Sequence, residues 1–88
     1  MITGETKTGF KFSIDENVTN DMRMLDAICD VQAGEKLKVT KIIALLLGDD
    51  KERLYAHVAE KDGRVPVEKI EAEILDIFNA FGESGKNS

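Results

Sequence analysis

The sequence lacks tryptophan, and cysteine, histidine, proline and tyrosine occur only once each. A single cysteine, Cys29, excludes an internal disulfide and a cysteine-based zinc site. We expect Cys29 to be a small buried hydrophobic residue of a protein in a reducing compartment. The single histidine, His57, belongs to no recognisable catalytic pattern, and we expect it on the surface. The sequence also has no G-x-S-x-G motif, Gly-rich phosphate loop or H-E-x-x-H motif, so we predict no catalytic, cofactor-binding or metal-binding residue and no enzymatic activity.

Long hydrophobic runs and clusters of positive charge are also missing. The longest uninterrupted apolar run, IIALLLG at residues 42–48, is far shorter than the ~20 residues that span a bilayer. The N-terminal sequence MITGETKTGF has neither the basic region nor the apolar stretch of a signal peptide. The 12 Lys and Arg residues are scattered and the net charge is −5, so phosphate backbones should repel the chain. We therefore expect a cytoplasmic protein with no membrane or nucleic-acid partner.

An alternating pattern near the start of the chain predicts a β-strand. Residues 8–14, TGFKFSI, place Phe10, Phe12 and Ile14 on one face, which should be buried. The preceding MITGETK can form a partner strand, with a turn near Gly4. Because an isolated hairpin is only marginally stable, we expect the aromatic side chains to pack on helices.

The rest of the chain has apolar residues at helical spacing in segments 18–33, 35–47, 50–61 and 66–81. The second segment is apolar around most of its circumference, so we place it at the centre of the fold. Each segment is followed by a glycine that should end the helix: Gly34, Gly48, Gly63 and Gly82.

We therefore predict a mainly α (α+β) fold, with a short N-terminal β-strand or hairpin followed by about four packed helices. Residues 1–82 should form a single domain, and residues 83–88, which have no apolar side chain, should be a mobile tail. In the last helix the core-facing arc should consist of Val67, Ile70, Ile74, Ile77, Phe78 and Phe81. Glu71, Glu73 and Asp76 should face water.

The segment IDENVTND carries oxygen-bearing side chains at alternate positions, close to the spacing of a calcium-binding loop. Such a loop needs a preceding helix, whereas the preceding residues alternate like a strand. The simpler interpretation is the start of the first helix, with acidic side chains near its positive end and Thr19 or Asn17 as its cap. We favour this interpretation over calcium binding.

The first helical segment has apolar residues on two sides. One stripe, which should face the core, consists of Val18, Met22, Leu25, Ile28 and Cys29. A second stripe contains Met24, Ala27 and Val31, and Leu75 lies beside the main apolar face of the last helix. These four residues either complete the core or form a surface for self-association or for an extended hydrophobic client. We name Met24, Ala27, Val31 and Leu75 as candidate partner-binding residues.

Several segments, taken in order after the short β region, resemble a known family. They are IDENVTNDMRMLDAI, KIIALLLGDD, ERLYAHVAEKDGRVPVEKI and EAEILDIFNAFGES. This order is similar to that of the tail assembly chaperones of long-tailed, siphovirus-type bacteriophages and prophages, particularly those of Gram-positive hosts. The resemblance covers roughly residues 8–82 and consists of size, acidity and the succession LLLGDD, DGRVPVE, ILDIF. The family has no fixed site motif, so no functional residue carries over.

The resemblance implies a non-enzymatic binding protein without cofactors. Proteins of this family coat the long, aggregation-prone, helical tape-measure protein before tail-tube subunits polymerise around it, and they tend to self-associate. They act in the host cytoplasm and are absent from the mature virion. A ribosomal frameshift near the end of the short form often yields a longer product, and Gly85-Lys86-Asn87 is compatible with an A-rich slippery stretch.

Three other functions stay open from the sequence. One is an acidic inhibitor or DNA mimic encoded by a phage or mobile element, which would carry carboxylates along one elongated face. A small calcium-responsive module is the second, and a subunit or regulator of a larger enzyme is the third.

The assignment of the core-facing arc in the last helix predicts that Ile74→Asp unfolds the domain. The substitution would place an unpaired carboxylate in the core, and its burial is expected to remove several kcal/mol, comparable to the whole stability of a small domain. Thermal unfolding followed by circular dichroism checks this expectation. An unchanged melting temperature would show that the arc is assigned to the wrong face.

Overall fold

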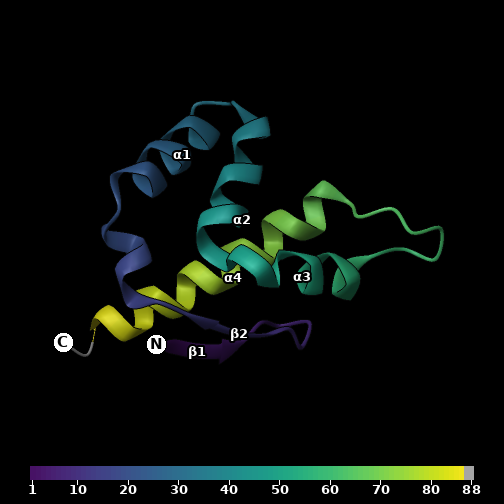
Figure 1. Cartoon of the computed structure of the whole chain (residues 1–88), viewed down its shortest axis with the longest axis horizontal. Helices are drawn as coiled ribbons and strands as arrows, with labels where there is room; N and C mark the ends of the chain where they lie inside the picture. Colours follow the sequence, from purple (N-terminus) through teal and green to yellow (C-terminus); the bar gives the residue numbers. More distant parts are fainter. Residues whose placement is uncertain (87–88) are drawn as a thin grey trace.

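The computed structural model describes residues 1–86, with side chains for residues 1–80. The chain is mainly helical behind a short antiparallel hairpin, as the sequence predicted. The hairpin consists of β1 (Ile2–Glu5) and β2 (Lys11–Ile14). In Figure 1 it lies below the long helix α4 (Val67–Lys86), and helices α1 and α2 lie above α4.

The hairpin pairs its two strands in the register Ile2↔Ile14 and Gly4↔Phe12. The predicted inward face is confirmed, because Phe10, Phe12 and Ile14 are all buried. The predicted turn near Gly4 is wrong. Gly4 lies within β1, and the turn is closed later by a hydrogen bond from Thr6 N to Phe10 O at 2.9 Å.

The polar segment after β2 starts helices, as the sequence predicted, but the caps are different residues. Asp15 Oδ1 accepts a hydrogen bond from Asn17 N at 2.9 Å at the start of a 3₁₀ helix, η1 (Glu16–Asn20). Asp21 Oδ1 accepts a hydrogen bond from Arg23 N at 2.8 Å at the start of α1 (Met22–Gln32). The predicted caps Thr19 and Asn17 are wrong, because the chain is extended at Asp21 and the α-helix begins only after it. These two carboxylates satisfy free N–H groups at helix starts.

The middle of the chain forms one continuous but bent helical segment. It consists of η2 (Lys36–Lys38), α2 (Val39–Leu47), η3 (Gly48–Asp50) and α3 (Lys51–Val58). Gly48, with φ of 54°, ends α2 and changes the direction of the chain. The expectation of about four separate packed helices is therefore slightly off, because α2 and α3 are arms of one bent segment (Figure 1).

The last helix is longer than the sequence predicted. Helix α4 continues through Gly82 and reaches Lys86, because a single glycine weakens a helix without obliging it to end. Of the residues predicted to form a mobile tail, 83–86 are therefore helical, and 87–88 lie outside the described residues.

The hydrophobic core lies between the hairpin, α4 and the bent segment. Among the described residues the buried apolar side chains form one cluster. The cluster contains Phe10, Phe12, Ile14, Met24, Ala27, Ile42, Ile43, Leu46, Leu47, Leu54, Val58, Ile70, Ile74 and Ile77. Helix α2 contributes more of these residues than α1 or α3 does, which agrees with its predicted central place.

Helix α1 packs with the face opposite to the one that the sequence favoured. Met24 is 0% exposed, whereas Met22 is 67% and Leu25 is 46% exposed. Cys29, expected to be buried, is exposed for the same reason. At about 100° per residue the two stripes lie on nearly opposite sides of the helix. The neighbouring helices bury the stripe of Met24 and Ala27.

No helix in the described part of the chain is both long enough and apolar enough to cross a lipid bilayer.

The pairing of Gly4 with Phe12 generates a prediction about stability. A Cβ atom at position 4 would lie 2.7 Å from Phe12 Cζ, which is too close. Gly4→Ala should therefore lower the free energy of unfolding by about 1–3 kcal/mol, the usual range for overpacking. This loss exceeds the gain of about 0.4–1 kcal/mol that alanine brings by restricting the unfolded chain. Urea denaturation measures the difference.

The control for this prediction is the same substitution in a variant that lacks the Phe12 ring. In Phe12→Leu, which removes the ring, Gly4→Ala should have a smaller effect, because the contact that opposes it is gone. An alanine variant as stable as the parent with Phe12 intact would contradict the packing of the hairpin.

Candidate functional site

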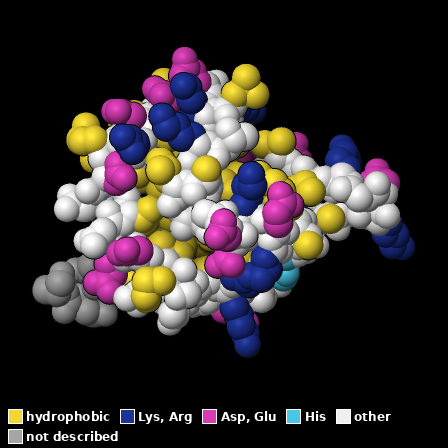
Figure 2. Space-filling model, in the orientation of Figure 1, with side chains coloured by type: hydrophobic (Ala, Val, Ile, Leu, Met, Phe, Trp, Pro, Cys, Tyr) yellow, Lys and Arg dark blue, Asp and Glu magenta, His cyan; other side chains and the backbone are white. Residues whose placement is uncertain are grey.

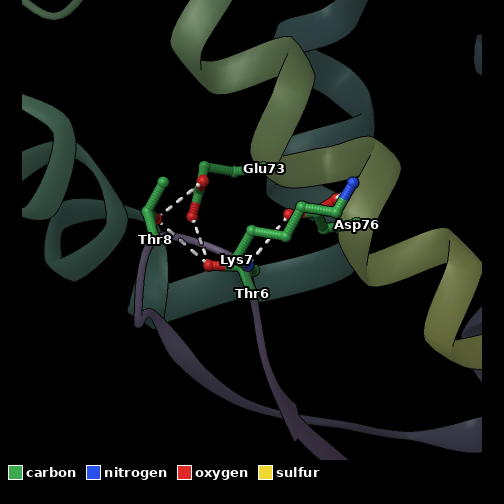
Figure 3. A network of polar contacts seen from close by, with 5 residues as sticks. All are labelled: Thr6, Lys7, Thr8, Glu73 and Asp76. Carbon is green, nitrogen blue, oxygen red and sulfur yellow. Dashed lines mark hydrogen bonds and ion pairs between the residues drawn. The ribbon is translucent and has the colours of Figure 1, made fainter.

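Among residues 1–80, a buried carboxylate beneath the hairpin turn and an apolar groove between helices have functional potential. The carboxylate is Glu73 in α4, whose residue is only 1% exposed. The prediction that Glu73 faces water is wrong. Thr6 Oγ1 donates a hydrogen bond to Glu73 Oε1 at 2.8 Å, and Thr8 Oγ1 donates one to Glu73 Oε2 at 2.9 Å (Figure 3). Both carboxylate oxygens therefore have donors.

The loop of the hairpin is also bound to Asp76, which follows Glu73 by about one turn of α4. The backbone N–H of Lys7 donates a hydrogen bond to Asp76 Oδ2 at 3.0 Å (Figure 3). Lys7 Nζ also lies 3.9 Å from Asp76 Oδ1. Within the turn, Thr6 Oγ1 accepts a hydrogen bond from Phe10 N at 3.1 Å. We call the set of Thr6, Lys7, Thr8, Glu73 and Asp76 the hairpin latch, because it fixes the turn to α4.

The hairpin latch includes a threonine beside a histidine, and the hydrogen bonds decide what this pair can do. Thr8 Oγ1 lies 3.0 Å from His57 Nε2, and the single hydroxyl proton of Thr8 is already donated to Glu73. His57 must therefore carry the proton on Nε2 and donate it to Thr8. An activated nucleophile needs the reverse arrangement, with the histidine as acceptor. The His57 ring also packs against Phe10, with 5.5 Å between ring centroids and the ring planes tilted by 53°, so this contact helps to hold the turn in place.

Sequence reasoning missed Glu73 because it assigned charged positions of the last helix to water. At about 100° per residue, Glu73 lies about 40° from Ile77, whereas Val67 lies about 80° from Ile77 on the other side. The structure buries Ile77 completely and leaves Val67 54% exposed. A helical wheel centred on Ile77 would have placed Glu73 inside the buried arc. The two threonines near the start of the chain were the missing partners.

An apolar groove lies between α1, α2 and α4. It is lined by Ile28, Val31, Gln32, Val39, Ile42, Glu71, Ile74, Leu75 and Phe78. Two of the four predicted partner-binding residues meet here, since Val31 comes from α1 and Leu75 from α4. Leu75 is 61% exposed. The other two, Met24 and Ala27, are wrong as surface residues, because both are buried in the core.

The size and chemistry of the apolar groove limit what can bind there. Its volume is about 260 Å³, below the range of about 300–1,000 Å³ typical of sites for drug-sized ligands. Most of its lining is aliphatic or aromatic, with polar atoms from Gln32 and Glu71. Hydrophobic side chains also reach the surface on the face drawn in Figure 2, between charged ones. The apolar groove suits a few hydrophobic side chains of another helix better than a whole cofactor.

Comparison of the chain with protein-family models, curated proteins and solved structures finds no significant match.

The hairpin latch predicts that Glu73→Ala destabilises the fold. The change removes the carboxylate that accepts hydrogen bonds from Thr6, which is 5% exposed, and from Thr8, so the two hydroxyls can bond only to each other, at 3.2 Å. The loss of these buried hydrogen bonds should lower stability by about 1–3 kcal/mol. Glu73→Gln should have a smaller effect, because its amide oxygen still accepts one hydroxyl. Urea denaturation of both variants measures the difference.

The matched control is Glu71→Ala, which removes a partly exposed carboxylate from the same helix. Its effect should stay within about 0.5 kcal/mol. Equal effects of the alanine substitutions at positions 71 and 73 would contradict the role given to Glu73.

Proposed function

We propose that this protein is a non-enzymatic tail assembly chaperone of a long-tailed phage or prophage, which binds the tape-measure protein in the host cytoplasm during tail morphogenesis. The resemblance of residues 8–82 to this family suggests the function, and the apolar groove is the observation that carries it. A chaperone of this kind needs accessible apolar surface that can bind a hydrophobic client without chemical reaction.

The apolar groove fits a helical client. Its walls are the helices α1, α2 and α4, and the exposed side chain of Leu75 lies at its edge. An amphipathic helix docks in such a groove through apolar residues spaced three and four apart. The tape-measure protein of this family is long and helical, so it offers many segments of this type. Glu71 and Gln32 in the lining can hydrogen-bond to polar side chains that flank the apolar ones.

The charge of the chain is compatible with a role that involves hydrophobic surfaces. With a net charge of −5, copies of the protein repel each other at long range, which keeps complexes with an aggregation-prone client dispersed. A chaperone can therefore expose apolar residues such as Leu75 and remain in solution.

The alternative of an acidic inhibitor or DNA mimic gains no support from the face drawn in Figure 2. Asp and Glu side chains alternate there with Lys and Arg side chains, and they form no continuous acidic row on this face. The buried Glu73 removes a further carboxylate from the surface.

The test of the proposed function is co-expression with the tape-measure protein encoded in the same genome. Wild-type protein should co-purify with the tape-measure protein and raise its soluble yield. Leu75→Glu should abolish both effects, because it places a charge at the edge of the apolar groove. Its melting temperature should stay close to that of the wild type, since Leu75 is 61% exposed.

The matched control is Met22→Glu, which introduces the same charge at a residue that is 67% exposed and does not line the apolar groove. This variant should bind like the wild type. Failure of the wild type to co-purify with the tape-measure protein would refute the proposed function, as would flanking genes that encode neither a major tail protein nor a tape measure. Equal loss with Met22→Glu would show that the apolar groove is not the site.

A further inference from the structure

The outer face of α1 carries apolar side chains that the fold leaves largely uncovered. Met22 is 67% exposed, Leu25 is 46% exposed, and Cys29 is also exposed. These positions follow one another at spacings of three and four residues, so their side chains lie on one face of the helix. Figure 1 shows α1 at the outer edge of the molecule. We call Met22, Leu25 and Cys29 the outer stripe.

The net charge of the protein is concentrated around the outer stripe. Residues 15–35, which comprise η1, α1 and the residues that flank them, contain six acidic residues and one basic residue, Arg23. The rest of the chain has eleven acidic and eleven basic residues, so residues 15–35 account for the whole net charge of −5. The six acidic residues are Asp15, Glu16, Asp21, Asp26, Asp30 and Glu35.

Two of these carboxylates follow one margin of the outer stripe. At about 100° per residue, Asp26 lies about 40° and Asp30 about 80° from Met22, on the side away from Leu25. Among residues 1–80, neither carboxylate forms an ion pair, whether with Arg23 or with a lysine of the adjoining η2. The opposite margin carries Ile28 and Gln32, beyond which the apolar groove begins.

We propose that the outer stripe binds a basic amphipathic helix of another protein. Apolar side chains of that helix, spaced three and four residues apart, pack on Met22 and Leu25. Lysine or arginine side chains beside them face Asp26 and Asp30. The excess of negative charge around α1 also attracts a basic partner to this face and speeds its association. The inference goes beyond the proposed function, because the outer stripe does not line the apolar groove.

A second copy of this chain fits the outer stripe poorly. If two copies of α1 packed antiparallel through their outer stripes, the margin with Asp26 and Asp30 would face the same margin of the other copy, and the like charges would repel. A parallel pair would place this margin beside Gln32, which has no charge. The partner must therefore bring basic residues that residues 15–35, apart from Arg23, do not have.

Binding of synthetic peptides to the full chain tests the inference. The probe is a helical peptide of alanine, leucine and lysine, about 18 residues long so that it exceeds the length of α1, with its leucines on one face. Calorimetry should give a dissociation constant in the micromolar range. Two control peptides should bind at least roughly tenfold more weakly. One has the same composition with its leucines distributed around the helix, and the other has glutamate for every lysine. Absence of binding by the probe, or equal binding of either control, would overturn the inference.

Two double variants with the same net charge separate the outer stripe from the general charge of the protein. Asp26→Asn with Asp30→Asn should weaken binding of the probe roughly threefold to tenfold, because it removes the charges that the lysines face. Asp49→Asn with Glu52→Gln removes two exposed carboxylates from η3 and α3 instead, and should have a clearly smaller effect. Equal weakening would show that net charge governs binding and would overturn the inference.

The apolar contact is tested without a change of charge. Met22→Ser with Leu25→Ser should weaken binding of the probe at least roughly tenfold, because it removes both apolar contacts. Leu75→Ser changes the apolar groove instead and should leave this binding unaltered. An NMR titration of the wild-type protein should place the largest shift changes in residues 22–32. Largest changes in α4, or the same changes when the protein is concentrated without peptide, would overturn the inference.

Discussion

The rotation of α4 about its own axis depends on the burial of Glu73. Two threonines of the hairpin turn donate to its carboxylate at 2.8 and 2.9 Å, and Asp76, one turn further along, binds the backbone of the same turn. An isolated two-stranded hairpin is marginal in water. Here the hairpin is held both by this polar attachment and by the burial of Phe10, Phe12 and Ile14. A buried carboxylate is tolerated only with such donors, so the position of the hairpin and the orientation of α4 determine each other.

The orientation of α4 decides which of its apolar residues remain outside the core. Because Glu73 takes a place within the buried arc, Val67 and Leu75 on the opposite side of that arc are turned towards solvent. Leu75 then lies at the edge of the apolar groove, and Val67 lines a hollow beside residues of η2 and α2. The polar contact beneath the hairpin and the exposure of these two residues thus belong to the same orientation of α4.

Helix α1 also has two apolar stripes of similar hydrophobicity, and the fold buries only one of them. The stripe of Met24 and Ala27 is buried, and Met22, Leu25 and Cys29 are exposed. Ile28 and Val31, one from each stripe, are only partly buried and line the apolar groove together with residues of α2 and α4. A small domain with apolar residues on both sides of a helix necessarily leaves some of them uncovered. Surfaces of this type commonly serve for binding.

The sequence by itself determined the mainly helical class, the alternating inward face of β2, the helical rather than calcium-binding character of IDENVTND and the central place of α2. These follow from local periodicity and capping, which depend on residues close together in the chain. It also led to Val31 and Leu75 as candidate surface residues. Only the tertiary structure decided which stripe of α1 is buried, that Glu73 is inside, and that Met24 and Ala27 belong to the core. These outcomes depend on partners distant in sequence, such as Thr6 and Thr8 for Glu73, and a helical wheel contains no information about which neighbour each face will meet.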